Sequence, residues 1–229
     1  MQIAELWRYP VKSMAGERLE AAEFGEGGIQ GDRVVQVRRA DGHMLDARAH
    51  PRLLSHRPTY GAKGELRIDG RMWDSEEVAR DVVAAAGAGT RLVWQESFAR
   101  FDLLPLLVAT DGAIAALGRD GRRLRPNIVV GGVDGLAERT WEGRELRVGE
   151  VHIGIHSLRD RCVMTTYDPD TQAQDHQVLK RIVHEFGGRM ALNCWVIRGG
   201  RIRVGDLVTL TNGTADPPPG VWGRYGTRP

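Results

Sequence analysis

Apolar residues in this chain occur in short runs, and glycines stand between many of these runs. The 29 glycines are spread along the whole sequence. Short apolar runs bounded by turn residues are typical of β-strands joined by tight turns. The pattern predicts strands over residues 34–38, 65–69, 91–95, 128–130, 144–148, 151–155, 191–197 and 201–210, the last of them interrupted at Gly205 and Asp206.

Three other segments repeat their apolar residues at the spacing of an α-helix. This spacing predicts helices over residues 75–86, 111–117 and 176–186. Asp74 or Ser75 is the expected N-cap of the first helix, because a short oxygen-bearing side chain can accept a bond from the free N–H groups of the first turn. Gly118 and Gly187 are expected to end the other two helices.

Length and charge narrow the class of protein. A chain of 229 residues can form one large or two small domains and bury a core without added cross-links. The formal charge of +2 argues against a protein that binds nucleic acid through bulk charge. Two cysteines, Cys162 and Cys194, are too few for a four-thiolate zinc or iron–sulfur site, although they could form one disulfide. Their scarcity favours a reducing, cytoplasmic environment.

Several common features are missing from the printed sequence. No apolar run is long enough to span a bilayer, and the first residues do not resemble a signal peptide, so we expect no membrane association. No His-Glu-x-x-His motif and no Gly-x-Ser-x-Gly turn occurs. Zinc-dependent and serine hydrolysis are therefore not predicted.

Cys162 stands in the most informative segment of the chain. Arg159 and Arg161 precede it, and a thiol near guanidinium groups ionises more readily to the thiolate that attacks electrophiles and binds metals. Residues 162–167 are expected to form a strand, and Asp-Pro-Asp-Thr over 168–171 predicts a rigid polar turn. Burial as a small apolar residue is the alternative for Cys162, and it is the favoured interpretation for Cys194.

Together, the polar motifs of the chain resemble those of the MOSC family, the domain related to the C-terminal part of molybdenum cofactor sulfurase. The N-terminal motifs are similar to those of the β-barrel that precedes MOSC in the amidoxime-reducing branch. Each motif is weak alone, but they occur in the family's order over about residues 1–212. The motifs are Tyr9-Pro10-Val11-Lys12-Ser13, Gly31-Asp32-Arg33, residues 47–53, Arg125-Pro126-Asn127-Ile128, Trp141, Arg161-Cys162, Thr165-Thr166, residues 168–171 and residues 202–206.

The resemblance implies a fold and its division. It implies a mainly β protein with a few short helices, of α+β class, made of two β-barrel-like domains. The expected divisions are residues 1–96 for the N-terminal barrel, 97–212 for the MOSC barrel and 213–229 for an extended tail. The chain departs from the family's pattern at Asp160, where a small hydroxyl residue occurs in that branch, and at Gln172, where glycine is frequent. It also lacks the branch's Glu-Pro-Leu after this turn.

The resemblance also implies a molybdenum cofactor with Cys162 as the metal ligand and the catalytic residue. Its pterin and phosphate would be held from the N-terminal half by Lys12, Ser13, Arg33 and Arg48, and from the MOSC half by Arg123, Arg125, Asn127 and Arg161. A soft metal favours a thiolate, and a phosphate favours cations and hydroxyls. From the residues alone, each cation could equally be a solvated surface charge, and Arg125-Pro126-Asn127 could be a simple turn.

The activity that this resemblance implies is reduction of small N-oxygenated compounds. The electrons would come from a separate donor, such as a ferredoxin, a flavoprotein or a cytochrome. One alternative is a carrier of the cofactor, or a sulfur-transfer module that holds a persulfide on Cys162; another is an interaction module whose site is lost. Pyridoxal phosphate binding is a further property that the family resemblance implies.

Overall fold

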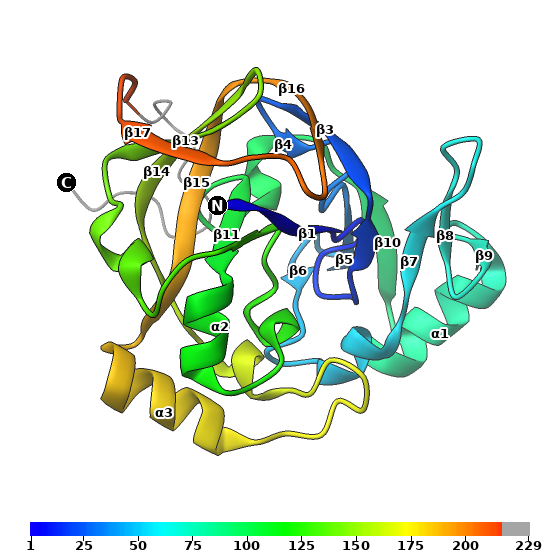
Figure 1. Ribbon diagram of the computed structural model, residues 1–229. Helices are drawn as coiled ribbons and strands as arrows, with labels where there is room; N and C mark the ends of the chain where they lie inside the picture. The colour runs from blue at the N-terminus through cyan, green and yellow to red at the C-terminus, as the bar shows by residue number, and fades with distance from the viewer. Residues whose placement is uncertain (217–229) are drawn as a thin grey trace.

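The computed structural model describes residues 1–216 and contains one large sheet, three small sheets and three α-helices (Figure 1). Only residues 213–216 of the expected tail are included, and residues 217–229 lie outside the described part. The large sheet has eight strands in the order β17 (Thr209–Asn212), β13 (Arg144–Val148), β14 (Val151–Asp160), β15 (Arg189–Arg198), β11 (Leu106–Thr110), β12 (Ile128–Gly131), β1 (Gln2–Arg8) and β2 (Glu17–Leu19).

Three small sheets of three strands each complete the β-structure. Their strands are, in spatial order, β10 (Thr90–Trp94), β5 (Val35–Arg39) and β6 (Met44–Leu45); β16 (Gly200–Arg203), β3 (Ala21–Gly25) and β4 (Gly28–Ile29); and β7 (Pro58–Tyr60), β8 (Leu66–Ile68) and β9 (Arg71–Met72). Short 3-10 helices connect them at Pro51–Ser55, Phe98–Arg100, Gly121–Leu124, Ala137–Thr140 and Val163–Thr166.

The predicted fold class is confirmed in its coarser form. The described chain is mainly β with three α-helices. Within residues 1–216, however, no sheet closes on itself, so the two expected barrels are not confirmed. The large sheet is open at both edges, because its outer strands each have one partner within residues 1–216. The strand β2 pairs with β1, and β17 pairs with β13.

All three helices form where the sequence predicts them. They are α1 (Glu76–Ala86), α2 (Asp111–Leu117) and α3 (His176–Phe186). Ser75 caps α1 by accepting a hydrogen bond from the Val78 amide at 3.3 Å, as expected from its side chain. Gly118 and Gly187 end α2 and α3 in the left-handed conformation that glycine adopts without strain. Figure 1 shows α2 and α3 beside the large sheet and α1 at the far side of the molecule.

The two halves of the chain share strands and a core. β1 pairs with β12, and β16 near the end of the chain pairs with β3 near its start. The main apolar cluster joins Ile3 and Phe24 to residues such as Val108 and Cys194. A second cluster in the first half also packs against Met164 and Tyr167. The boundary between residues 96 and 97 stays a prediction, and this shared interior crosses it.

Gly154 of β14 allows the close pairing of β14 with β15. It lies opposite Trp195, and a Cβ at position 154 would overlap the buried Trp195 ring. We expect Gly154→Ala to lower the free energy of unfolding by about 2 kcal/mol, because overpacking forces a rigid ring to move. Denaturant unfolding measures this loss. Gly25→Ala, where no atom lies within 4 Å of the added Cβ, should change stability by less than about 0.5 kcal/mol. Equal losses in both variants would contradict the packing argument.

Candidate functional site

Every predicted site residue except Arg123 lines a cavity of about 490 Å³. Residues from both halves of the chain line it. Six of the lining side chains are lysine or arginine and three are aspartate, so the wall is positively charged overall. The lining residues are Lys12, Ser13, Arg33, Asp46, Arg48, Phe101, Asp102, Leu103, Leu104, Leu106, Leu107, Leu124, Arg125, Asn127, Ser157, Leu158, Arg159, Asp160, Arg161, Cys162, Met164 and Asn193.

Cys162 lies at the start of a 3-10 helix rather than in a strand. β14 ends at Asp160, and Val163–Thr166 forms η5, so the predicted strand over 162–167 is wrong. The Thr165 amide and hydroxyl both donate to the Cys162 carbonyl, at 3.1 and 2.9 Å. This tight turn leaves the Cys162 side chain half-buried at the cavity wall. Thr165 is buried and serves the turn.

Arg123 supports this turn from behind the cavity. Its guanidinium donates to the Thr166 carbonyl at 2.8 Å and pairs with Asp168 at 3.0 Å. Asp168 in turn accepts bonds from the amides of Asp170 and Thr171, at 3.1 and 3.0 Å. The rigid polar turn predicted over 168–171 is therefore confirmed, and the structure places Arg123 in its support.

Cys194 occupies the position that its sequence context favours. It is fully buried in β15 within the main core, and burial raises the pKa of its thiol. Both cysteines are free thiols. Cys162 is therefore the only thiol of the described residues that reaches the cavity.

Asp102, which the sequence analysis missed, gathers three of the cavity's cations. Its carboxylate pairs with Lys12 at 2.8 Å, with Arg159 at 3.0 Å and with Arg48 at 3.2 Å. Burial alone raises the pKa of Asp102, but the three cations outweigh it and hold this pKa well below its usual range. Much of the charge of Lys12 and Arg48 is thus already compensated within the protein.

Arg48 links this ionic cluster to the cysteine. It pairs with Asp46 at 3.1 Å as well as with Asp102. Burial on its own lowers the pKa of Arg48, yet a side-chain hydrogen bond with Cys162 and the charge of Asp102 raise it above its ordinary value. The guanidinium therefore places a positive charge beside the Cys162 sulfur.

Arg33 and Asn127 line the cavity near the end of β1. Arg33 pairs with the fully buried Asp32 and donates to the Asn127 side-chain oxygen at 3.2 Å. The same oxygen accepts from the Leu107 amide at 3.1 Å. Asn127 therefore holds β1, β11 and Arg33 together, and its amide has little capacity left for a ligand.

Arg125 and Arg161 carry the least compensated charges of the wall. Burial lowers the pKa of each guanidinium to about 10. The Nη2 atom of Arg125 and the Nε atom of Arg161 are buried and have no hydrogen-bond partner within residues 1–216. An unsatisfied buried donor costs about 1–3 kcal/mol, more when charged. The donor set thus fits an anionic group that accepts from both arginines.

Three lining residues have backbone conformations that side chains disfavour. The φ angles are 72° at Ser13, 56° at Arg33 and 56° at Arg125. Such left-handed residues each store about 1 kcal/mol or more, and they concentrate at binding sites. Here the unusual turns direct three polar residues from separate loops toward one cavity.

Part of the cavity wall is apolar, and the sequence did not reveal it. Leu103, Leu104 and Leu107 come from the loop before β11 and from that strand, and they face a cavity that also contains Leu158 and Met164. Cavities with an apolar wall and a few fixed polar groups suit organic ligands. Arg159, Ser157 and Asn193 are further polar members that the sequence analysis left unassigned.

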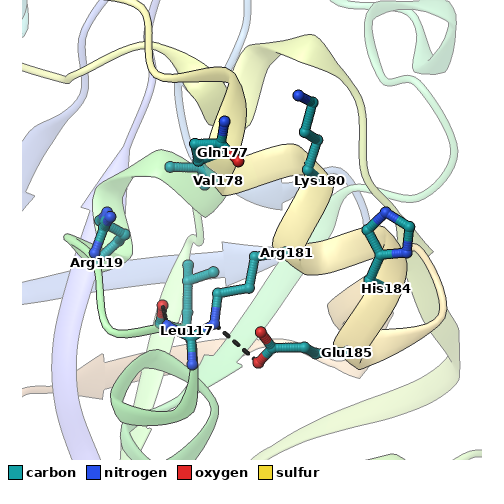
Figure 2. Close-up of a pocket in the computed structure, with 8 residues that line it drawn as sticks. All are labelled: Leu117, Arg119, Gln177, Val178, Lys180, Arg181, His184 and Glu185. Carbon is teal, nitrogen blue, oxygen red and sulfur yellow. Dashed lines mark hydrogen bonds and ion pairs between the residues drawn. The ribbon is translucent and has the colours of Figure 1, made fainter.

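A second depression lies on the surface between α2 and α3 (Figure 2). Its volume is about 460 Å³. Arg181 crosses it, pairing with Glu185 at 2.9 Å and donating to the Leu117 carbonyl at 3.0 Å, so its charge serves the helix packing. No cysteine and no predicted site residue lines this depression. We therefore place the candidate site in the first cavity.

Comparison with known proteins defines the class of protein to which this fold and cavity belong. Residues 1–103 match the MOSC N-terminal beta barrel domain, and residues 112–209 match the MOSC domain. The chain belongs to the family of proteins in which these two domains follow one another. The resemblance drawn from the sequence motifs is therefore confirmed.

Several relatives are mitochondrial amidoxime-reducing components. The component 2 proteins of Macaca fascicularis and Homo sapiens are each 28% identical to this chain, over 76% of it and 69% of their own length. The human component 1 is 26% identical over 74% of this chain and 67% of its own length.

Among solved structures, the YUAD protein from Bacillus subtilis has a similar fold. Its TM-score is 0.52 at 14% sequence identity, with 93% of this chain and 96% of that chain covered. At this identity the likeness concerns the fold alone. None of the helices within residues 1–216 has the length and apolar character that crossing a bilayer requires.

Proposed function

We propose that the chain holds a molybdenum cofactor in the cavity and reduces small N-oxygenated compounds, such as hydroxylamines or amidoximes. The single observation that carries the proposal is the meeting of Cys162 with cations from both halves of the chain in one cavity. The relatives named for amidoxime reduction support the same reaction class.

The donor set fits such a cofactor at both of its ends. The Cys162 sulfur would bind the metal, because soft transition metals favour thiolate ligands. Arg125 and Arg161 would receive the phosphate on their unpartnered nitrogens. Lys12, Ser13, Arg33, Arg48 and Asn127 would form the surrounding wall, while Arg123 holds the Cys162 turn in place.

The bound cofactor would supply two-electron transfer coupled to removal of an oxygen atom, which no protein side chain provides. The chain would bind and orient the substrate, and its arginines would set the local charge. The electrons would come from a separate donor protein, such as a ferredoxin, a flavoprotein or a cytochrome. Turnover with a nicotinamide nucleotide and no other protein would contradict the need for a separate donor protein.

Metal analysis and an activity assay test the proposal together. Protein produced with molybdate should contain close to one molybdenum per chain and should reduce a hydroxylamine or an amidoxime with a strong chemical electron donor. A preparation with less than about a tenth of a molybdenum per chain and no reductase activity would contradict it, because a bound metal centre of this kind is retained through its thiolate bond.

The alternative is a carrier of the cofactor or a sulfur-transfer module. Arg48 places a cation beside the Cys162 sulfur, and a cysteine in such a cavity can also carry a persulfide. Mass spectrometry that finds a persulfide on Cys162 in metal-free protein would support this alternative. The cytoplasmic location and pyridoxal phosphate binding stay predictions.

A further inference from the structure

A β-bulge in β14 brings the side chains of His156 and Ser157 into contact beside the cavity. Ile155 pairs with Cys194 and Ser157 pairs with Asn193, so β14 carries one extra residue, His156, at this point. A bulge disrupts the alternation of side chains along a strand and re-aims them. As a result, the Nδ1 atom of His156 lies 2.8 Å from the Ser157 hydroxyl oxygen, and Ser157 lines the cavity that contains Cys162.

A chain of hydrogen bonds fixes which way the neighbouring amide points. Arg159 donates to the Asn193 side-chain oxygen at 3.3 Å, and arginine can only donate. The Asn193 nitrogen must therefore face Ser157, and it donates to the Ser157 oxygen at 3.2 Å. Arg159 is itself anchored by Asp102. One lone pair of the Ser157 oxygen is thus always occupied by Asn193.

Whether Nδ1 of His156 carries a proton then decides where the Ser157 proton points. In imidazolium, Nδ1 is a donor, so both lone pairs of the Ser157 oxygen are taken and its own O–H must point elsewhere, toward the cavity. In a neutral ring that carries its proton on Nε2, Nδ1 accepts the Ser157 proton and turns it away from the cavity. His156 is half-buried, and it can exchange protons without opening the fold.

From this geometry we infer that Ser157 and His156 deliver a proton to a substrate in the cavity, an inference that rests on the proposed function. Reduction of R–NH–OH to R–NH₂ and water needs two electrons and two protons. The N–O bond breaks, and the donor protein supplies the electron pair. The oxygen leaves as water with the Ser157 proton, His156 replaces that proton from Nδ1, and the nitrogen takes its proton from solvent.

The surroundings of His156 set the expected direction of the pH dependence. Burial lowers the pKa of His156, and the charge of Glu142 opposes this shift. On the cavity side its contact is the neutral Ser157, and the next charged group along the hydrogen-bonded chain is Arg159. A lowered pKa means that imidazolium is lost early as pH rises. Turnover should therefore decline as pH rises through this lowered pKa.

Ser157→Ala tests the catalytic role of the hydroxyl. Because proton transfer by a placed group contributes about 100-fold or more, kcat should fall about 100-fold, with molybdenum per chain unchanged. Ser157→Thr keeps a hydroxyl and should keep most of the activity. Ser97→Ala, at an exposed serine without a side-chain cap bond, should match the wild type. If the wild type is active and Ser157→Ala is equally active at every pH, the proton-delivery role is overturned while the proposed function stands.

His156→Gln tests the positioning role of the ring. The glutamine amide can still donate to Ser157 but does not titrate. The decline of kcat with rising pH should therefore disappear in this variant, whereas a purely structural histidine would leave the shape of the profile unchanged. A profile that keeps the wild-type decline would overturn the role of His156.

A third measurement needs no cofactor. NMR titration of metal-free protein should show the His156 pKa about half a unit lower in Ser157→Ala, because the imidazolium loses a hydrogen-bond acceptor. As a control, Ser97→Ala should leave the His156 titration unchanged. If the His156 pKa is the same in wild type and Ser157→Ala, the hydrogen-bonded pair of His156 and Ser157 is overturned. If the wild type holds no molybdenum and reduces nothing, the proposed function fails, and the proton-delivery role fails with it.

Discussion

Cys162→Ser is expected to lose nearly all bound molybdenum and all measurable reductase activity. Serine keeps the shape of the side chain, but its hydroxyl stays protonated at neutral pH and is a hard ligand for a soft metal. We expect less than about a tenth of the wild-type metal content. Metal analysis of proteins purified in parallel provides the measurement, and thermal unfolding of the metal-free forms checks that the variant still folds.

The second cysteine provides a matched control for this loss. Cys194 is fully buried in β15, so Cys194→Ala removes a thiol that cannot reach the cavity. It should cost about 1 kcal/mol of stability by leaving a small void and should keep its molybdenum. Equal metal contents in Cys162→Ser and wild type would show that Cys162 does not bind the metal.

Asp102→Asn is expected to cause the largest loss of stability among single changes at the site. Lys12, Arg48 and Arg159 would then face one another without their shared counter-charge. Breaking a buried ion pair costs about 3–5 kcal/mol. Because the Asp102 side chain is 22% exposed, solvent screening reduces the expected loss to about 2–3 kcal/mol. Denaturant unfolding at neutral pH measures it.

The pH dependence of this loss follows from the direction of the Asp102 shift. Its folded-state pKa lies below the unfolded value, so its stabilisation is complete above the unfolded value, near 4, and is lost as pH falls. The difference between wild type and Asp102→Asn should therefore shrink below about pH 4. Asp160→Asn, at an exposed carboxylate in the same cavity, should cost less than about 0.5 kcal/mol. Equal losses of stability in Asp102→Asn and Asp160→Asn would contradict the stabilising role of the Asp102 ion pairs.

Local signals predicted the helices and led to the hypothesis about the chemistry of the site. Capping side chains and apolar spacing were sufficient for α1, α2 and α3, because these signals act within a few residues. The residues beside Cys162 indicated a reactive thiol for the same reason. The family motifs located eight of the 22 residues that line the cavity.

What the sequence could not show depends on contacts between distant residues. Asp102 has no local signal, and its role arises only when Lys12, Arg48 and Arg159 converge on it. The apolar and β-branched residues after Cys162 favour a strand. Tertiary contacts instead favour η5, because Arg123 binds the Thr166 carbonyl and Met164 packs on the first half of the chain.

The bulge at His156 is also invisible in the sequence, because it is defined by the register of β14 against β15. The barrel expectation had a different origin: it came from the resemblance rather than from residues of this chain. The described strands form an open sheet instead.

Strand sharing between the halves restricts how a large ligand can be loaded. If the two halves separated about a hinge, the hydrogen bonds between β1 and β12 and those between β16 and β3 would have to break. Such cooperative ruptures are far more costly than a loop movement. A bulky organic molecule therefore reaches the interior through the mouth of the finished fold, or it joins the polypeptide while the strands are still assembling.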